Sequence, residues 1–165
     1  NRKCEFGAAR DRKQQFADIA KGKEILSVFF DELPQPIFTP PWNRCSDETA
    51  EVLSQLGFKV LSRESRAQPL SVAPLLEIPV SIDWFAKRKG MPLTREQIGT
   101  MIADQISSQS QVGIMLHHAV MDTAQRDHLC ELLSLFGEFD QVELHTMWSL
   151  FEESGKACPT LAGVI

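Results

Sequence analysis

Apolar residues recur every three or four positions in the first third of the chain, a spacing that predicts amphipathic helices. The first such pattern covers residues 16–30 and stops before Pro34, which cannot continue a helix. The second begins after Ser46, whose hydroxyl suits an N-cap, and ends at Gly57, which readily adopts the left-handed conformation. This part of the chain is therefore expected to contain two helices.

Two further helices are expected in the second half. Residues 94–97, Thr-Arg-Glu-Gln, have the pattern of a capping box, and the apolar face that follows continues to Ile106. Asp122 or Thr123 can cap the fourth helix, which Gly137 closes.

Short apolar runs rich in β-forming residues separate these helices. They are residues 37–38, 58–62, 75–84, 112–116 and 142–147. Residues 63–74 show no period and are expected to form a long loop. Helix and strand alternate about every fifteen residues, which is typical of βα units with a parallel sheet. The expected fold class is α/β, either an open doubly wound sheet or part of a βα barrel.

Size and charge limit the class of protein further. With 165 residues, 43% of them hydrophobic, the chain is large enough to bury a core of its own. We expect one domain over residues 1–153 and a loose C-terminal tail over residues 154–165. The net charge of −5, with no Lys/Arg run longer than residues 87–89, argues against nucleic acid or a membrane surface as a partner. No apolar run approaches the length that spans a membrane.

Cysteine usage favours a reducing compartment. No Cys-x-x-Cys pair occurs among the four cysteines, which are Cys4, Cys45, Cys130 and Cys158. Scattered thiols suit a cytoplasmic protein better than a disulfide framework or a thiolate metal site. The chain begins at Asn1 rather than Met, so we expect it to be a processed or truncated product.

The first strand-like run ends abruptly in Thr-Pro-Pro-Trp-Asn-Arg, residues 39–44. The two prolines stop a sheet ladder and hold the next residues in an extended loop. Trp42, Asn43 and Arg44 then offer a flat apolar surface, a donor and acceptor, and a fixed cation, the side chains that a sugar needs. The alternative is a loop whose Trp caps the core and whose Arg is solvated.

Two later strand-like runs also end in candidate functional residues. One ends in Asp83 and Trp84, and the other in His117 and His118, of which one should face a pocket. Because the carboxyl ends of parallel strands share one edge of a sheet, these residues can converge with the first motif. A carboxylate can orient a histidine that delivers a proton, so Asp83 and His117 form the candidate pair. Taken alone, His117 is better explained as a structural residue bonded to a backbone carbonyl, and Asp83 and Trp84 are equally well explained as a cap followed by a core aromatic.

These segments resemble the third, fourth and fifth motifs of the polysaccharide deacetylase (NodB-type) family. The matching residues are Thr-Pro-Pro-Trp-Asn-Arg, Ser-x-Asp-Trp and Leu-His-His, in that order. Residues 3–7, Lys-Cys-Glu-Phe-Gly, and the first helix resemble the segment that precedes the third motif in its Pro-Pro-Trp-Asn-Arg subgroup. The resemblance covers residues 3–148. It implies a parallel-stranded partial (β/α) barrel whose N-terminal strands are missing.

The family hydrolyses acetyl groups on sugars with a divalent metal, usually zinc, that polarises the acetyl carbonyl. The resemblance implies an acetylated oligo- or polysaccharide as the partner. It also implies that His117 is the acid that protonates the leaving amine and that Asp83 tunes it, with Arg44 as a third catalytic candidate. The substrate-binding candidates are Trp42, Trp84, Asn43, Leu116 and His118.

The chain also departs from the family pattern. The first two family motifs, an Asp pair and a His-x-x-x-His, are absent from the sequence. Thr39 stands where the third motif has Arg, and Val80 stands where the fourth begins with Asp. We therefore expect zinc in the complete protein, no metal bound by this chain alone, and no activity as presented. A barrel without its first strands exposes sheet edges, which predicts a lost upstream polypeptide or a homodimer that covers them.

Two other functions stay open. The first is a non-catalytic carbohydrate-binding or interaction module that uses Trp42 and Trp84 as stacking platforms. The second is an unrelated doubly wound protein that binds an anion at the helix N-terminus near Ser46, although the sequence has no Gly-rich loop.

Overall fold

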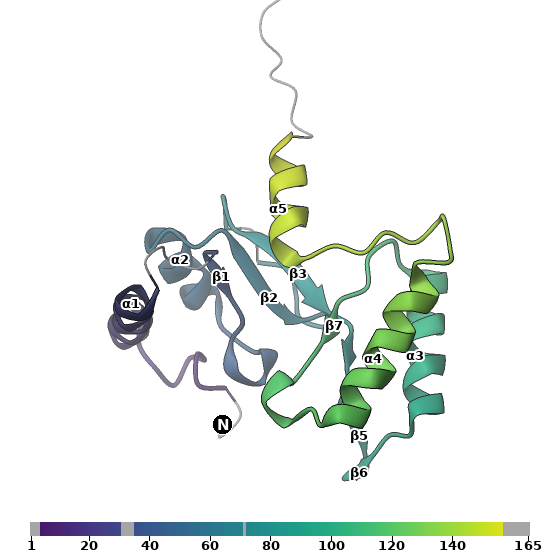
Figure 1. Cartoon of the computed structure of the whole chain (residues 1–165). Coiled ribbons are helices and arrows are strands. Elements are labelled where there is room, and N and C mark those ends of the chain that lie inside the picture. The colour runs from purple at the N-terminus through teal and green to yellow at the C-terminus, as the bar shows by residue number, and fades with distance from the viewer. Residues whose placement is uncertain (1–3, 31–34, 71, 157–165) are drawn as a thin grey trace, which may run out of the picture. The chain divides into compact units, whose positions relative to one another are not determined.

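A computed structural model describes residues 4–30, 35–70 and 72–156 of the chain (Figure 1). Helices and short strands follow one another along these ranges, which confirms the α/β class predicted from the sequence. Within the described ranges, no helix combines the length and the apolar character that crossing a bilayer requires.

The chain separates into two compact units. The first unit comprises the residues up to Pro79 together with the segment from Thr146, and the second unit is Val80–His145. Each unit has a hydrophobic core of its own.

Both helices predicted for the first part of the chain are present in the first unit. Helix α1 (Arg12–Phe29) begins after Asp11, whose carboxylate caps it. Helix α2 (Asp47–Gln55) begins after Ser46, and the chain leaves it through Gly57, whose φ is +80°. Only a residue without a side chain adopts this φ freely, so Gly57 fixes where α2 ends.

The sheet of the first unit has three parallel strands. Their order is β1 (Ile37–Phe38), β2 (Val60–Glu64), β3 (Leu76–Val80). Ile37 pairs with Val60, and the Leu76 amide donates to the carbonyl of Lys59 at 2.8 Å, so all three strands start at one end of the sheet. Side chains of α1, α2 and β2 form the core: Ile19, Ala50, Val52, Leu53 and Leu61.

The second unit combines short strands with two longer helices. Its elements are β4 (Ile82–Asp83), β5 (Lys87–Arg88), β6 (Met91–Pro92), α3 (Arg95–Ser108), β7 (Ile114–Met115) and α4 (Thr123–Phe136). Strands β4 and β7 pair in parallel with Asp83 opposite Met115, whereas β5 and β6 form an antiparallel hairpin. The predicted caps are present at Thr94 for α3 and at Asp122 for α4. The buried core residues are Ile82, Trp84, Ile98, Ile102 and Met121.

The single strand predicted over residues 75–84 is wrong. The chain forms β3 and β4 there, in two different sheets. The amides of Ser81 and Ile82 both donate to the carbonyl of Gly113, at 2.9 and 3.0 Å. This pairing with a segment about thirty residues away in sequence ends β3 and starts β4, and a local apolar pattern does not report it.

The strand predicted over residues 142–147 is also wrong, because helix α5 (Met147–Lys156) begins at its end. The Ser149 amide donates to Oγ1 of Thr146 at 3.1 Å, and the Thr146 amide donates to Oγ of Ser149 at 3.0 Å. This reciprocal cap selects a helix. Residues 154–156, which we expected in the tail, belong to α5, and the rest of the predicted tail lies outside the described residues.

Candidate functional site

The second unit brings the predicted pair of Asp83 and His117 together. Asp83 is the last residue of β4, and His117 follows β7 by two residues. Nε2 of His117 lies 2.9 Å from Oδ1 of Asp83. The two side chains are 40% and 39% exposed, respectively. The pair is thus held by a hydrogen bond and is still open to a ligand, as general acid–base chemistry requires.

Phe85 fixes both members of this pair. Its amide donates to the same Oδ1 of Asp83 at 2.8 Å, which closes a local turn around the carboxylate. Its ring meets the imidazole of His117 edge-to-face, with centroids 5.5 Å apart. Phe85 was not predicted from the sequence as a residue of this site. The signal was available, because an Asp often bonds the backbone amide two residues on.

The hydrogen bond to Asp83 assigns the tautomer of His117. An ionised carboxylate only accepts hydrogen bonds, so the proton between the two groups belongs to Nε2 of the imidazole. Nδ1 of His117 is then the nitrogen that can take a proton from a ligand or give one to it.

Leu116 and His118 flank His117 along the chain. Leu116 is 40% exposed. His118, the first residue of the short helix η2 (His118–Val120), is also exposed. Both side chains therefore lie at the surface of the second unit, and their roles in substrate binding stay predictions.

Trp84 is a core residue of the second unit. Its side chain is 5% exposed, and Nε1 donates to Oε1 of Gln125 at 2.9 Å. The guanidinium of Arg95 lies 4.4 Å from the centre of the indole ring, a cation–π contact that the sequence analysis missed. Burial and these two contacts account for Trp84 as a core residue, and a role as a wall of a sugar pocket stays a prediction.

The Pro-Pro-Trp-Asn-Arg motif in the first unit forms a strained turn. Trp42 and Asn43 lie in helix η1 (Pro41–Asn43) with φ of 61° and 55°. This left-handed conformation costs about 1–2 kcal/mol for a residue with a Cβ atom, although asparagine tolerates it better. Pro40 is fully buried, and its carbonyl accepts from the Asn43 amide at 2.9 Å. Strained turns are enriched at ligand-binding sites, and this one presents a Trp42 side chain that is 58% exposed.

Arg44 is held by an acidic residue from the neighbouring strand. Its Nε donates to Oε1 of Glu64, the last residue of β2, at 3.1 Å. Both side chains are partly exposed. The bond joins the chain after β1 to the end of β2, and the sequence analysis did not anticipate Glu64 because the two residues meet only in the sheet.

A more buried ion pair anchors the loop after β2. The Arg63 side chain is 7% exposed, and its Nη2 lies 3.1 Å from Oε1 of Glu77. Nη2 also donates to the carbonyl of Gln68, and the Leu70 amide donates to Oε1 of Glu77. The predicted long loop is therefore tied to β2 and β3 by side-chain hydrogen bonds.

The predicted convergence of all strand ends on one pocket stays a prediction. Trp42 and Arg44 belong to the first unit, whereas Asp83 and His117 belong to the second. The structure establishes the geometry within each unit.

The described residues do not fit the zinc site that the family resemblance implies. Structural and catalytic zinc sites use at least three protein ligands. No group of three or more His, Cys, Asp and Glu side chains is placed to hold a metal ion in the part of the chain that the structure describes. Asp83 and His117 bond to each other, so we assign neither of them as a ligand.

Comparison with known proteins gives no relative. No family model matches the sequence, and no curated protein or solved structure is significantly similar to the chain. The function is therefore argued from the geometry of the site.

Proposed function

We propose that the chain is the acid-supplying part of a carbohydrate deacetylase, built as a partial (β/α) barrel of the polysaccharide deacetylase type. The single observation that carries this proposal is the Asp83–His117 hydrogen bond of 2.9 Å at the carboxyl ends of two adjacent parallel strands. In parallel βα architectures, catalytic residues occupy this position. The three motifs in family order support the same function.

In this proposal, His117 moves the proton. Removal of an acetyl group leaves an amine or a hydroxyl that must be protonated as it departs. Asp83 holds Nε2, so the imidazolium would donate from Nδ1 and become the neutral ring. Phe85 keeps the ring in place during the transfer.

The first test follows the imidazole in the chain itself. Titration with N-acetylated chito-oligosaccharide should shift the ring resonances of His117 and leave those of His145, which lies outside the three matched motifs, unchanged. His145 is a suitable internal control because it pairs with Glu143, at 3.1 Å. Ring resonances of His117 that do not move at saturating sugar would contradict substrate binding at this pair.

The second test measures chemistry in the complete gene product. Acetate release from the same oligosaccharide should fall about a hundred- to ten-thousand-fold in His117→Ala, the range that general acid catalysis supplies. The matched control is His128→Ala, since His128 is an exposed residue of α4 that lies outside the three matched motifs. Equal acetate release from His117→Ala and the unaltered protein would end the deacetylase proposal.

A second candidate function is carbohydrate binding without catalysis, and the exposure of Trp42 favours it. An indole that is 58% exposed on a strained turn is a ready surface for stacking on a sugar ring. Affinity that survives a chelator, disappears in Trp42→Ala and persists in Trp148→Ala would support this function. Trp148 serves as the control because its indole is engaged with Phe151 and Glu152.

A further inference from the structure

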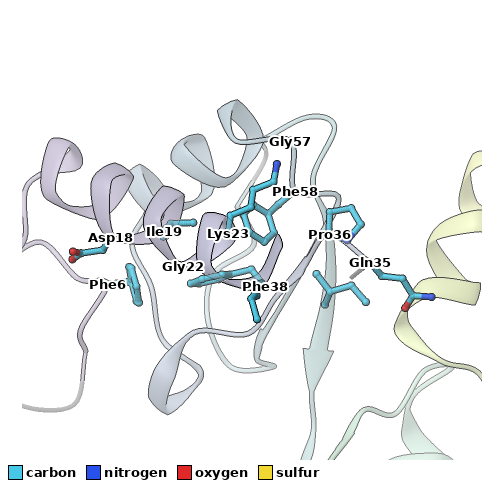
Figure 2. A pocket seen from close by; sticks show the side chains of 12 residues that line it. Phe6, Asp18, Ile19, Gly22, Lys23, Gln35, Pro36, Phe38, Gly57 and Phe58 are labelled. Atoms are coloured by element: carbon cyan, nitrogen blue, oxygen red, sulfur yellow. The ribbon is translucent and has the colours of Figure 1, made fainter. Parts of the chain in front are cut away.

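The first unit contains a cavity that neither the sequence motifs nor the proposed function use. Its volume is about 550 Å³, and α1, β1 and the turn between α2 and β2 line it (Figure 2). Small-molecule sites commonly have volumes of roughly 300–1,000 Å³ and mostly apolar walls. The cavity is therefore of a size that accepts a small ligand.

Aromatic rings form much of the wall. Phe6 and Phe38 meet edge-to-face with centroids 5.3 Å apart, and Phe38 meets Phe58 in the same way at 5.8 Å. Figure 2 shows the three rings with Ile19 along the cavity. Edge-to-face packing holds the rings in fixed orientations, so they offer a preformed apolar surface.

The charged residues of the wall are arranged unequally. Asp18 lines the cavity but is neutralised by Arg10, whose Nη2 lies 2.8 Å from its Oδ2. Lys23 also lines the cavity, 5.9 Å from the centre of the Phe58 ring. Its Nζ donates to the carbonyl of Leu56 at 2.7 Å, and it forms no ion pair with any residue in the described ranges.

We propose that this cavity binds a small amphipathic carboxylate, with an apolar tail among the phenylalanine rings and the carboxylate on the ammonium of Lys23. An ammonium has three N–H donors, and the Leu56 carbonyl occupies one of them. The ammonium can therefore bond a carboxylate and keep its hydrogen bond to the Leu56 carbonyl at the end of α2. A ligand with a cationic head would instead meet Lys23 with like charge.

Gly22 provides a way to block the cavity without disturbing its wall. It lines the cavity from within α1, and a Cβ atom added there would have no other atom within 4 Å. A leucine side chain can thus enter the space that a ligand tail would fill. Gly99 is the matched control, because it lies within α3 of the second unit and its added Cβ is equally unobstructed.

The experiment is a titration of the isotope-labelled chain with decanoate, decanol and decylamine, followed by amide chemical shifts. Decanoate should bind one per chain and shift the amides of Gly22, Phe38 and Gly57. Decanol should bind about tenfold more weakly, because its neutral hydroxyl cannot form the hydrogen bond between charged groups that a carboxylate forms with Lys23. Decylamine should bind more weakly still, because its ammonium is repelled by that of Lys23. Equal affinity for the three ligands, or shifts confined to the second unit, would overturn the proposal.

Variants separate the roles of the tail and the head. Gly22→Leu should abolish binding of decanoate and decanol, whereas Gly99→Leu should bind both normally. Lys23→Met should lose about tenfold in decanoate affinity with decanol unchanged, and Lys23→Arg should retain decanoate. Circular dichroism establishes that each variant is folded. Normal decanoate binding by Gly22→Leu would overturn the proposal. So would a chain that sediments as a dimer and does not bind decanoate, since a second copy would then cover the cavity.

Discussion

The two units hold their candidate residues in different ways. In the first unit a buried central strand supports the site, and the strained Trp42 turn and the Arg44–Glu64 pair both stand at strand ends around it. In the second unit the supporting sheet is a pair of two-residue strands, and a single carboxylate oxygen of Asp83 orders the site. Backbone conformation thus fixes the Trp42 turn of the first unit, whereas hydrogen bonds to one side chain fix His117 in the second.

The largest expected effect comes from removing the buried ion pair of the first unit. Glu77→Ala leaves the nearly buried Arg63 without its carboxylate and should lower the free energy of unfolding by about 3 kcal/mol. Amide hydrogen exchange should show lost protection in β2 and unchanged protection in β4 and β7. The control is Glu64→Ala, which breaks a partly exposed pair and should cost less than about 1 kcal/mol. Equal loss of protection in both units would show that the Arg63–Glu77 pair does not stabilise the first unit independently of the second.

Asp83→Ala tests whether one side chain orders the second site. It removes the acceptor of both the His117 and the Phe85 hydrogen bonds and should cost about 2 kcal/mol. Nitrogen-15 chemical shifts of the imidazole should then report a mixture of tautomers in place of one protonated at Nε2. Asp83→Asn keeps an acceptor oxygen and should preserve the Phe85 turn at a cost below about 1 kcal/mol. A single unchanged tautomer in Asp83→Ala would show that other contacts hold the ring.

Trp42→Gly tests backbone strain in the first site. Glycine adopts the φ of 61° freely, so the variant should gain about 1 kcal/mol in free energy of unfolding by denaturant. Trp42→Ala, which keeps a Cβ atom, serves as the control and should show no such gain. A glycine variant less stable than the alanine variant would mean that the turn is not strained.

The smallest effect concerns thiol chemistry. Burial raises the pKa of the Cys45 thiol in the first unit from 9.0 to about 11, against a smaller opposing effect of Arg63. At pH 8, iodoacetamide should modify the exposed Cys130 of the second unit and leave Cys45 intact. Between pH 9 and 11 the unfolded chain loses this proton before the folded chain does, so the contribution to stability falls as pH rises. In Cys45→Ala the free energy of unfolding should lack this fall between pH 9 and 11. Equal alkylation of Cys45 and Cys130 at pH 8 would contradict the raised pKa of the Cys45 thiol.

Local signals in the sequence predicted the helices well. Thr94 and Asp122 cap helices through their own side chains, Ser46 forms a capping box with Thr49, and Gly57 ends a helix by its backbone. Each of these residues acts within a few positions of the helix end. The division of residues 75–84 depends on hydrogen bonds to Gly113 and could not be seen locally. Lys89 and Gly90 form the tip of the β5–β6 hairpin, with φ of 52° and 84°. A glycine at this position is a turn signal that was overlooked in the sequence.

In the candidate site, the Asp83–His117 pair could be predicted from the sequence, but the partners of the other site residues could not. The meeting of Asp83 and His117 followed from the rule that parallel strands end at one edge, and the structure places them in hydrogen-bond contact. The contacts of Glu64 with Arg44 and of Arg95 with Trp84 depend on which elements become neighbours in three dimensions. Residue type alone could not select these partners.

One oxygen atom of Asp83 serves the backbone and the imidazole at once. Oδ1 accepts from the Phe85 amide and from His117, so a rotation of the carboxylate releases both. Loosening of the ring and exposure of that amide to solvent are consequently coupled events. The deuterium uptake of the Phe85 amide can therefore report how often the Asp83 carboxylate leaves the position in which it holds both groups.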